Sequence, residues 1–171
     1  MRIAVAAAFL ALVMAPATQA QAPNVTAVLE KSGQHTKFLN LLHSQRINVI
    51  LDDDGSTVFA PTHNAFESLE PGTLNSLKQQ QMALLAQGHI LPQFHTLVSF
   101  ETANNPIHTQ ASGHDGSYTL NITVGTNNLL NVSTGIVDAR VNDVISIVDP
   151  LAVYSIDKVL WPHELVNGTV P

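Results

Sequence analysis

Residues 57–66 read Thr-Val-Phe-Ala-Pro-Thr-His-Asn-Ala-Phe, and this stretch decides the fold. Val58 and Phe59 favour β-structure, which predicts a short buried strand at the start of the stretch. Pro61 fixes its own φ and biases the residue before it to an extended conformation, so the strand should end there. We therefore predict a strand-to-helix corner that fills the core and carries no chemistry of its own.

Helical patterns dominate the first half of the chain. Either Thr62 or Asn64 can cap a helix after the corner, and Asn24 can cap an earlier one that ends at Gly33. Residues 94–100 can form either a helix or a strand. Further helical segments are expected at residues 25–31, 35–44, 73–77 and 79–87.

The second half reads as short strands. Residues 118–124 alternate apolar and polar side chains, which predicts a strand with one buried and one exposed face. Asn142-Asp143 is interpreted as a turn between two strands. Short strands are expected at residues 89–91, 107–110, 118–124, 129–133, 136–140, 144–148 and 153–160. Helices followed by a meander of strands predict an α+β fold in one domain.

The first residues have the pattern of a targeting segment. Arg2 and the uninterrupted apolar run at residues 3–13 predict a secretory signal peptide over residues 1–20. The run is shorter than the roughly 20 residues that a membrane-spanning helix needs. We expect one domain over residues 24–166, followed by a short stub at residues 167–171.

The composition excludes several classes of protein. Thirteen acidic residues stand against seven Lys and Arg, for a net charge of −6, which becomes −7 once the leader is removed. An acidic chain of this kind has no electrostatic footprint for nucleic acid or anionic membranes. The chain has no cysteine, which excludes disulfide frameworks, thiol catalysis and zinc–cysteine sites.

Four Asn-x-Ser/Thr triplets are candidate sites for N-linked glycans. They begin at Asn24, Asn121, Asn131 and Asn167, and none contains proline at the second position. In a secreted chain, we expect these four side chains to lie at the surface and the protein to be a glycoprotein.

The sequence offers little for catalysis or metal binding. It has no Gly-x-Ser-x-Gly elbow and no glycine-rich phosphate loop, and Asp157-Lys158 is interpreted as a strand-face pair. The turn at residues 52–55 is acidic but lacks the ligand spacing of a calcium loop. The eight histidines include no i, i+4 pair on a predicted helix, so no metal or other cofactor is expected. His89 is expected to hold a backbone carbonyl at the edge of the core.

Several motifs resemble one known family. Residues 57–66 and 154–162 resemble the two signature segments of the fasciclin domain, and Gly-His-Ile-Leu-Pro at residues 88–92 resembles its central histidine motif. The resemblance covers residues 24–166. Further stretches, at residues 71–77, 105–106, 131–135 and 151–154, are similar to the plant branch of the family, the fasciclin-like arabinogalactan proteins.

The resemblance implies a β-wedge of short strands with helices packed on it, in which residues 57–66 and 154–162 form adjacent central strands. It implies an extracellular, non-catalytic role in cell adhesion and plant cell-wall organisation, including the secondary wall, with cell-wall polysaccharide or extracellular proteins as partners. His89 and Ile90 would belong to an adhesion motif, as proposed for animal relatives.

Two questions stay open at this point. The resemblance implies a lipid anchor, but its signal is not visible before Pro171, so we expect either a truncated chain or a soluble member. A second functional hypothesis is a secreted module that binds a small or apolar ligand in a pocket between the helices and the wedge.

Overall fold

The predicted central strand pair is present. In the computed structural model, which describes residues 23–49, 51–112 and 118–166, β1 (Ser56–Pro61) runs parallel to β7 (Leu151–Ile156). Val58 lies opposite Val153 and Phe59 opposite Tyr154, and Val58 and Phe59 have no exposed surface. The two segments that the resemblance paired, about 90 residues apart, are therefore neighbours in the sheet.

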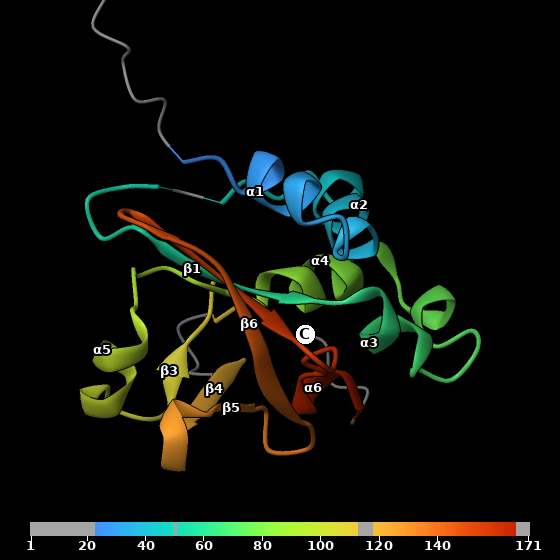
Figure 1. Ribbon diagram of the computed structural model, residues 1–171. Coiled ribbons are helices and arrows are strands. Elements are labelled where there is room, and N and C mark those ends of the chain that lie inside the picture. The colour runs from blue at the N-terminus through green and yellow to red at the C-terminus, as the bar shows by residue number, and fades with distance from the viewer. Residues whose placement is uncertain (1–22, 50, 113–117, 167–171) are drawn as a thin grey trace, which may run out of the picture.

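The strands form one seven-stranded sheet in the order β2-β1-β7-β6-β5-β4-β3 (Figure 1). All neighbours are antiparallel except β1 and β7. The remaining strands are β2 (Ile90–Leu91), β3 (Ile107–His108), β4 (Thr119–Val124), β5 (Leu130–Ser133) and β6 (Asp138–Val148).

The helices begin and end at the residues that local chemistry favours. The Asn24 side chain accepts a hydrogen bond from the Thr26 amide at the start of α1, and Gly33 ends that helix with φ of 68°. Thr62 caps α3 by accepting from the Ala65 amide. The helices are α1 (Val25–Ser32), α2 (Thr36–Ser44), α3 (His63–Glu67), α4 (Gln79–Gln87), α5 (Leu97–Thr102) and α6 (His163–Val166), with single 3-10 turns η1 (Leu74–Ser76) and η2 (Thr126–Asn128).

The central strands separate two apolar clusters. Alternate residues of β1 and β7, such as Val58 and Val153, face α1, α2 and α4, whereas Phe59 and Tyr154 face β3–β5 and α5 (Figure 1). The Phe59 and Tyr154 rings stack with centroids 5.8 Å apart. Because each strand buries both of its faces, the predicted corner is core, as expected.

Two predictions about the strands need revision, and one segment that was left open is now assigned. The two strands expected at residues 136–140 and 144–148 are one strand, β6, because β6 pairs with β7 from Val141 to Val148 and takes up the extra residues in two register shifts. In the segment at residues 94–100, which allowed a helix or a strand, residues 97–100 form the start of α5 and residues 94–96 precede it. The last strand begins at Leu151 and ends at Ile156, earlier than expected.

Candidate functional site

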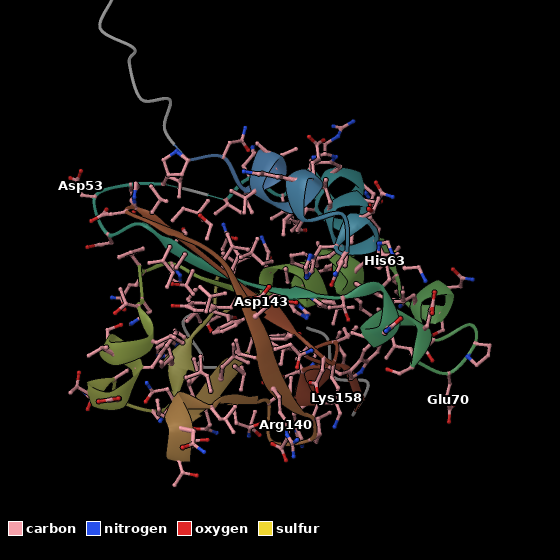
Figure 2. The ribbon with its side chains drawn as sticks, in the orientation of Figure 1. Asp53, His63, Glu70, Arg140, Asp143 and Lys158 are labelled. Carbon is pink, nitrogen blue, oxygen red and sulfur yellow. The ribbon has the colours of Figure 1, made fainter. Side chains whose placement is uncertain are left out.

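A cleft of about 400 Å³ opens between α1 and β6. β5 pairs with β6 only through residues 138–140, so within the described part of the chain no strand pairs with residues 141–148 on that side. The C-terminal half of α1 and the loop after it form one wall, and residues 143–146 form the other. Figure 2 shows Asp143 part-way along β6 below α1 and α2, while Arg140 and Lys158 lie toward the opposite end of the molecule.

A chain of hydrogen bonds lies at the floor of this cleft. Ser32 donates its hydroxyl hydrogen to the Leu29 carbonyl at 2.7 Å, so the Ser32 oxygen accepts from Nδ1–H of His35 at 2.8 Å. Nε2 of His35 then accepts from the Ser155 hydroxyl at 2.9 Å. His35 is 2% exposed and Ser155 is 3% exposed, so two polar side chains are buried beneath the cleft and satisfy each other.

The surroundings favour the neutral form of His35. Burial lowers the pKa of His35, His63 lowers it further through charge repulsion, and the Asp143 carboxylate opposes both effects. The neutral ring fits the observed network because one nitrogen donates and the other accepts. Ser155 and His35 have the relation of nucleophile and base, but Ser155 is closed off within strand β7. We interpret the pair as the rigid floor of the cleft.

Asp157 and Lys158, predicted to be a strand-face pair, lie just beyond the end of β7, so that prediction is wrong. Asp157 accepts a hydrogen bond from the Arg140 backbone amide at 2.8 Å and so joins the ends of β6 and β7. Lys158 is exposed. Across residues 23–49, 51–112 and 118–166, no group of three or more His, Cys, Asp or Glu side chains could hold a metal ion.

Two of the candidate glycan sites lie side by side on the outer face of β4 and β5. The strands pair so that Asn121 is opposite Ser133 and Thr123 is opposite Asn131. Each asparagine thus faces the hydroxyl residue of the other triplet, and the two asparagines are diagonal neighbours about 7–8 Å apart. Between them, Ile122 and its neighbours on the same strands point into the core. We call this surface the sequon face.

The remaining candidate glycan sites are near the chain ends. Asn24 is exposed, and its Oδ1 accepts the capping bond of α1, so capping and glycan attachment at Nδ2 use different atoms of one side chain. Asn167 lies outside the described residues, as does the predicted signal peptide. Attachment of glycans at these four residues stays a prediction.

The predicted adhesion motif, His89 and Ile90, lies in the core. The two side chains are 0% and 1% exposed, so neither is accessible to a partner. Nδ1–H of His89 donates to the Leu85 carbonyl at 2.8 Å, and Nε2 accepts from the Leu160 amide at 2.9 Å. The predicted bond to a backbone carbonyl is therefore confirmed. An adhesive role of the motif stays a prediction, and its buried side chains could contribute only indirectly, by fixing the position of β2.

Burial also changes the proton affinity of His89. Burial lowers the pKa of His89 to about 4, which outweighs the opposing bond to Leu85. The neutral ring therefore ties α4 to the segment after β7 over the whole pH range above that value.

A second hollow, of about 600 Å³, adjoins the sequon face. Its lining includes Asn131, Asp138, Arg140 and Lys158. Asp138 and Arg140 are the β6 partners of Ser133 and Asn131, so they share the outer face with the triplets. A glycan attached to Asn131 would lie over this hollow and would hinder the approach of an external partner.

Comparison with known proteins decides the family. The family profile described as the Fasciclin domain matches residues 33–162. The chain belongs to the fasciclin domain family. A solved structure described as a FAS1 domain pair from the insect cell adhesion molecule fasciclin I is similar with a TM-score of 0.58 and 19% identity, over 76% of this chain and 46% of that chain. This likeness confirms the single α+β fasciclin fold.

Plant relatives of this fasciclin domain are more similar in sequence. Fasciclin-like arabinogalactan proteins 11, 6 and 13 of Arabidopsis thaliana are 46%, 43% and 44% identical to it, over 91%, 88% and 88% of this chain. The alignments cover 67%, 64% and 64% of those proteins, so the chain spans about two thirds of their length. Among the described residues of the fasciclin domain, no helix has both the length and the apolar character needed to cross a membrane.

Sequence reasoning found some of the site residues and missed others. It placed Asn121 on a polar strand face and His89 at a backbone carbonyl, and both placements are confirmed. It did not find the pair of His35 and Ser155, which are 120 residues apart in the sequence. No local pattern links two such residues, so only the folded fasciclin domain reveals the cleft.

Proposed function

We propose that this chain is the folded domain of a secreted plant glycoprotein that acts in cell adhesion and in the organisation of the cell wall, including the secondary wall. The domain is non-catalytic and contacts cell-wall polysaccharide or extracellular proteins from the apoplast or the outer face of the plasma membrane. A lipid anchor on a longer form of the chain would be compatible with this role.

The likeness to the Arabidopsis fasciclin-like arabinogalactan proteins is the observation that carries the proposal. Membership of the fasciclin family and the likeness to a domain pair from an insect cell adhesion molecule support an adhesion-type role at the cell surface. The sequon face supports a glycoprotein, because both triplets present their asparagine and hydroxyl residues outward. The acidic charge of the chain argues against nucleic acid as a partner.

A second candidate function is the binding of a small ligand between the helices and the sheet. The cleft between α1 and β6 favours this hypothesis by its position. Its rim is formed by exposed polar residues, among them Lys31, Gln34 and Asp143, rather than by an apolar lining. That character fits a hydrophilic ligand better than an apolar one.

Retention on plant cell walls tests the proposed function. The full chain would be expressed in plant cells, collected from the apoplast, deglycosylated and titrated onto isolated walls. We expect saturable retention, and we expect Val58→Asp, which places a charge in the core, to abolish it together with the fold. Accumulation inside the cell, or retention that does not saturate, would contradict the proposal.

A further inference from the structure

The cleft between α1 and β6 combines hydrogen-bonding groups of both kinds. The Lys31 ammonium donates, the Asp143 carboxylate accepts, and the Gln34 amide does both. These three side chains are exposed at the rim. They line the same cleft as His35 and Ser155, which are buried at its floor and hydrogen-bonded to each other.

Aliphatic surface lies between these polar groups. Val28 of α1 and Ile145 of β6 line the cleft and are partly buried. A ligand that fits must therefore present both hydroxyl groups and C–H surface along its length. Saccharides have this alternation, whereas a purely apolar ligand would make no hydrogen bonds with the rim groups.

The size and openness of the cleft suit part of a chain molecule. Its volume of about 400 Å³ lies within the range of about 300–1,000 Å³ that is typical of ligand sites. The rim residues are exposed, and no described strand pairs with residues 141–148 on that side. The ends of an oligosaccharide can therefore leave the cleft without a clash with another strand.

The negative charge of the chain favours a neutral saccharide over an acidic one as the ligand of the cleft. Asp143 brings a negative charge into the cleft, and the chain as a whole carries thirteen acids against seven Lys and Arg. Lys31 is the one Lys or Arg among the described residues that line this cleft. A uronic acid polymer would meet repulsion from the domain as a whole, whereas a neutral saccharide would not.

The geometry points to the α1–β6 cleft as the binding site for a neutral saccharide chain of the cell wall. This inference rests on the proposed function and deepens it by naming the site and the chemical class of its ligand. Asp143, Gln34 and Lys31 bind the sugar hydroxyls, and the His35–Ser155 hydrogen bond ties the loop after α1 to β7, the strand that pairs with β6 at Asp143. The sequon face lies elsewhere on the sheet, so glycans attached to Asn121 or Asn131 would leave the cleft open.

Calorimetric titration of the full secreted chain tests the inference. The probes are cellohexaose, xylohexaose and β-1,4-galactohexaose as neutral saccharides and hexagalacturonate as the acidic one. We expect at least one neutral probe to bind, and Gln34→Ala and Asp143→Asn each to weaken it about tenfold, the equivalent of about 1.4 kcal/mol. The matched control is Asp138→Asn, the same change on the same strand outside the cleft, which should leave the affinity unchanged.

Each other outcome overturns a stated part of the account. Neutral binding that is equal in all variants would place the site elsewhere, and a preference for hexagalacturonate would overturn the neutral class. Retention on walls without binding of any probe would overturn the inference and leave the proposed function standing. Failure of the wild-type chain to bind walls would overturn the proposed function itself. Exposed Gln34 and Asp143 should tolerate these substitutions, which a thermal unfolding curve of each variant would verify.

Discussion

The α1–β6 cleft and the sequon face are both solvent-facing parts of one sheet, and they differ in what lies beneath them. Under the cleft, His35 and Ser155 are buried and hydrogen-bonded to each other. Under the sequon face, the buried residues of β4 and β5 are all apolar, and the polar residues point outward. The sequon face is an ordinary amphipathic strand surface, whereas the cleft places polar groups where burial is costly.

The difference shows where a site is to be expected in this fold. The buried pair is held from both sides, because His35 is hydrogen-bonded to Ser32 of α1 and to Ser155 of β7. These bonds fix the spacing between α1 and β7. An amphipathic surface fixes nothing beyond its own strands and can carry bulky glycans without strain. The two regions should therefore respond differently to mutation.

The largest difference is expected beneath the sequon face. Ile122→Ala should lower the free energy of unfolding by about 3 kcal/mol, because Ile122 is 2% exposed and its loss leaves a cavity. Thr123→Ala, the adjacent outward position, should change it by less than about 0.5 kcal/mol. Urea unfolding of the unglycosylated chain measures both, and equal losses would show that the two faces of β4 are not distinct.

The next effect is a loss of stability in acid that arises at His89. This histidine is hydrogen-bonded to backbone atoms, whereas His35 at the floor of the cleft is bonded to two serine side chains. The pKa of His89 falls from 6.5 to about 4 on folding, so the contribution of its neutral ring to the free energy of unfolding is complete above pH 6.5. That contribution, about 3 kcal/mol, is lost as the pH falls from 6.5 through 4. Denaturant midpoints measured between pH 7 and 4 should show this loss, and His89→Gln should flatten the profile.

His108→Gln is the matched control for that experiment, since His108 is exposed on β3. It should leave the wild-type pH profile unchanged. An identical profile for wild type and His89→Gln would mean that protonation of His89 does not limit stability in acid. Lowered pKa values of His35 and His95, both caused by burial, should leave a smaller acid sensitivity in the His89 variant.

A smaller effect is expected at the floor of the cleft. Ser155→Ala and His35→Gln should each lower the free energy of unfolding by about 1–2 kcal/mol, because each leaves a buried polar atom without its present partner. In a double-mutant cycle the two should couple by about 1 kcal/mol. Strict additivity would show that the hydrogen bond between Nε2 and the serine hydroxyl does not couple the loop after α1 to β7.

The smallest effect is expected on the sequon face itself. Asn121→Gln and Asn131→Gln should each remove one glycan from the secreted chain and change its stability by less than about 0.5 kcal/mol. Glycopeptide mass spectrometry measures the first and thermal unfolding the second. An unchanged glycopeptide pattern in either variant would exclude that site.

Much of the fold could be predicted because its signals are local. Pro61 and Thr62 define the corner after β1, and Asn24 and Gly33 define the ends of α1, through geometry that involves only nearby residues. The alternation in β4 predicted which side faces the core for the same reason. The pairing of β1 with β7 depended instead on the resemblance to the fasciclin family.

The failures have a common physical cause, which is that tertiary pairing overrides local preference. Asn142-Asp143 has the composition of a turn, yet continuous pairing with β7 keeps β6 extended there. The apolar residues at 94–100 are compatible with a helix or a strand, so the sequence pattern alone could not assign the segment. In the structure the Ser99 amide donates to the Thr96 side chain, and this N-cap bond begins α5. The cleft could not be predicted, since its walls come from opposite ends of the chain.

Amide hydrogen exchange tests the contrast between the two regions most directly. The secreted chain would be compared with and without a saturating concentration of the neutral hexasaccharide that it binds. We predict added protection at residues 31–35 and 143–146, the two walls of the cleft, and no change at residues 121–123 and 131–133. Protection confined to the sequon face, with the cleft unchanged, would contradict the account.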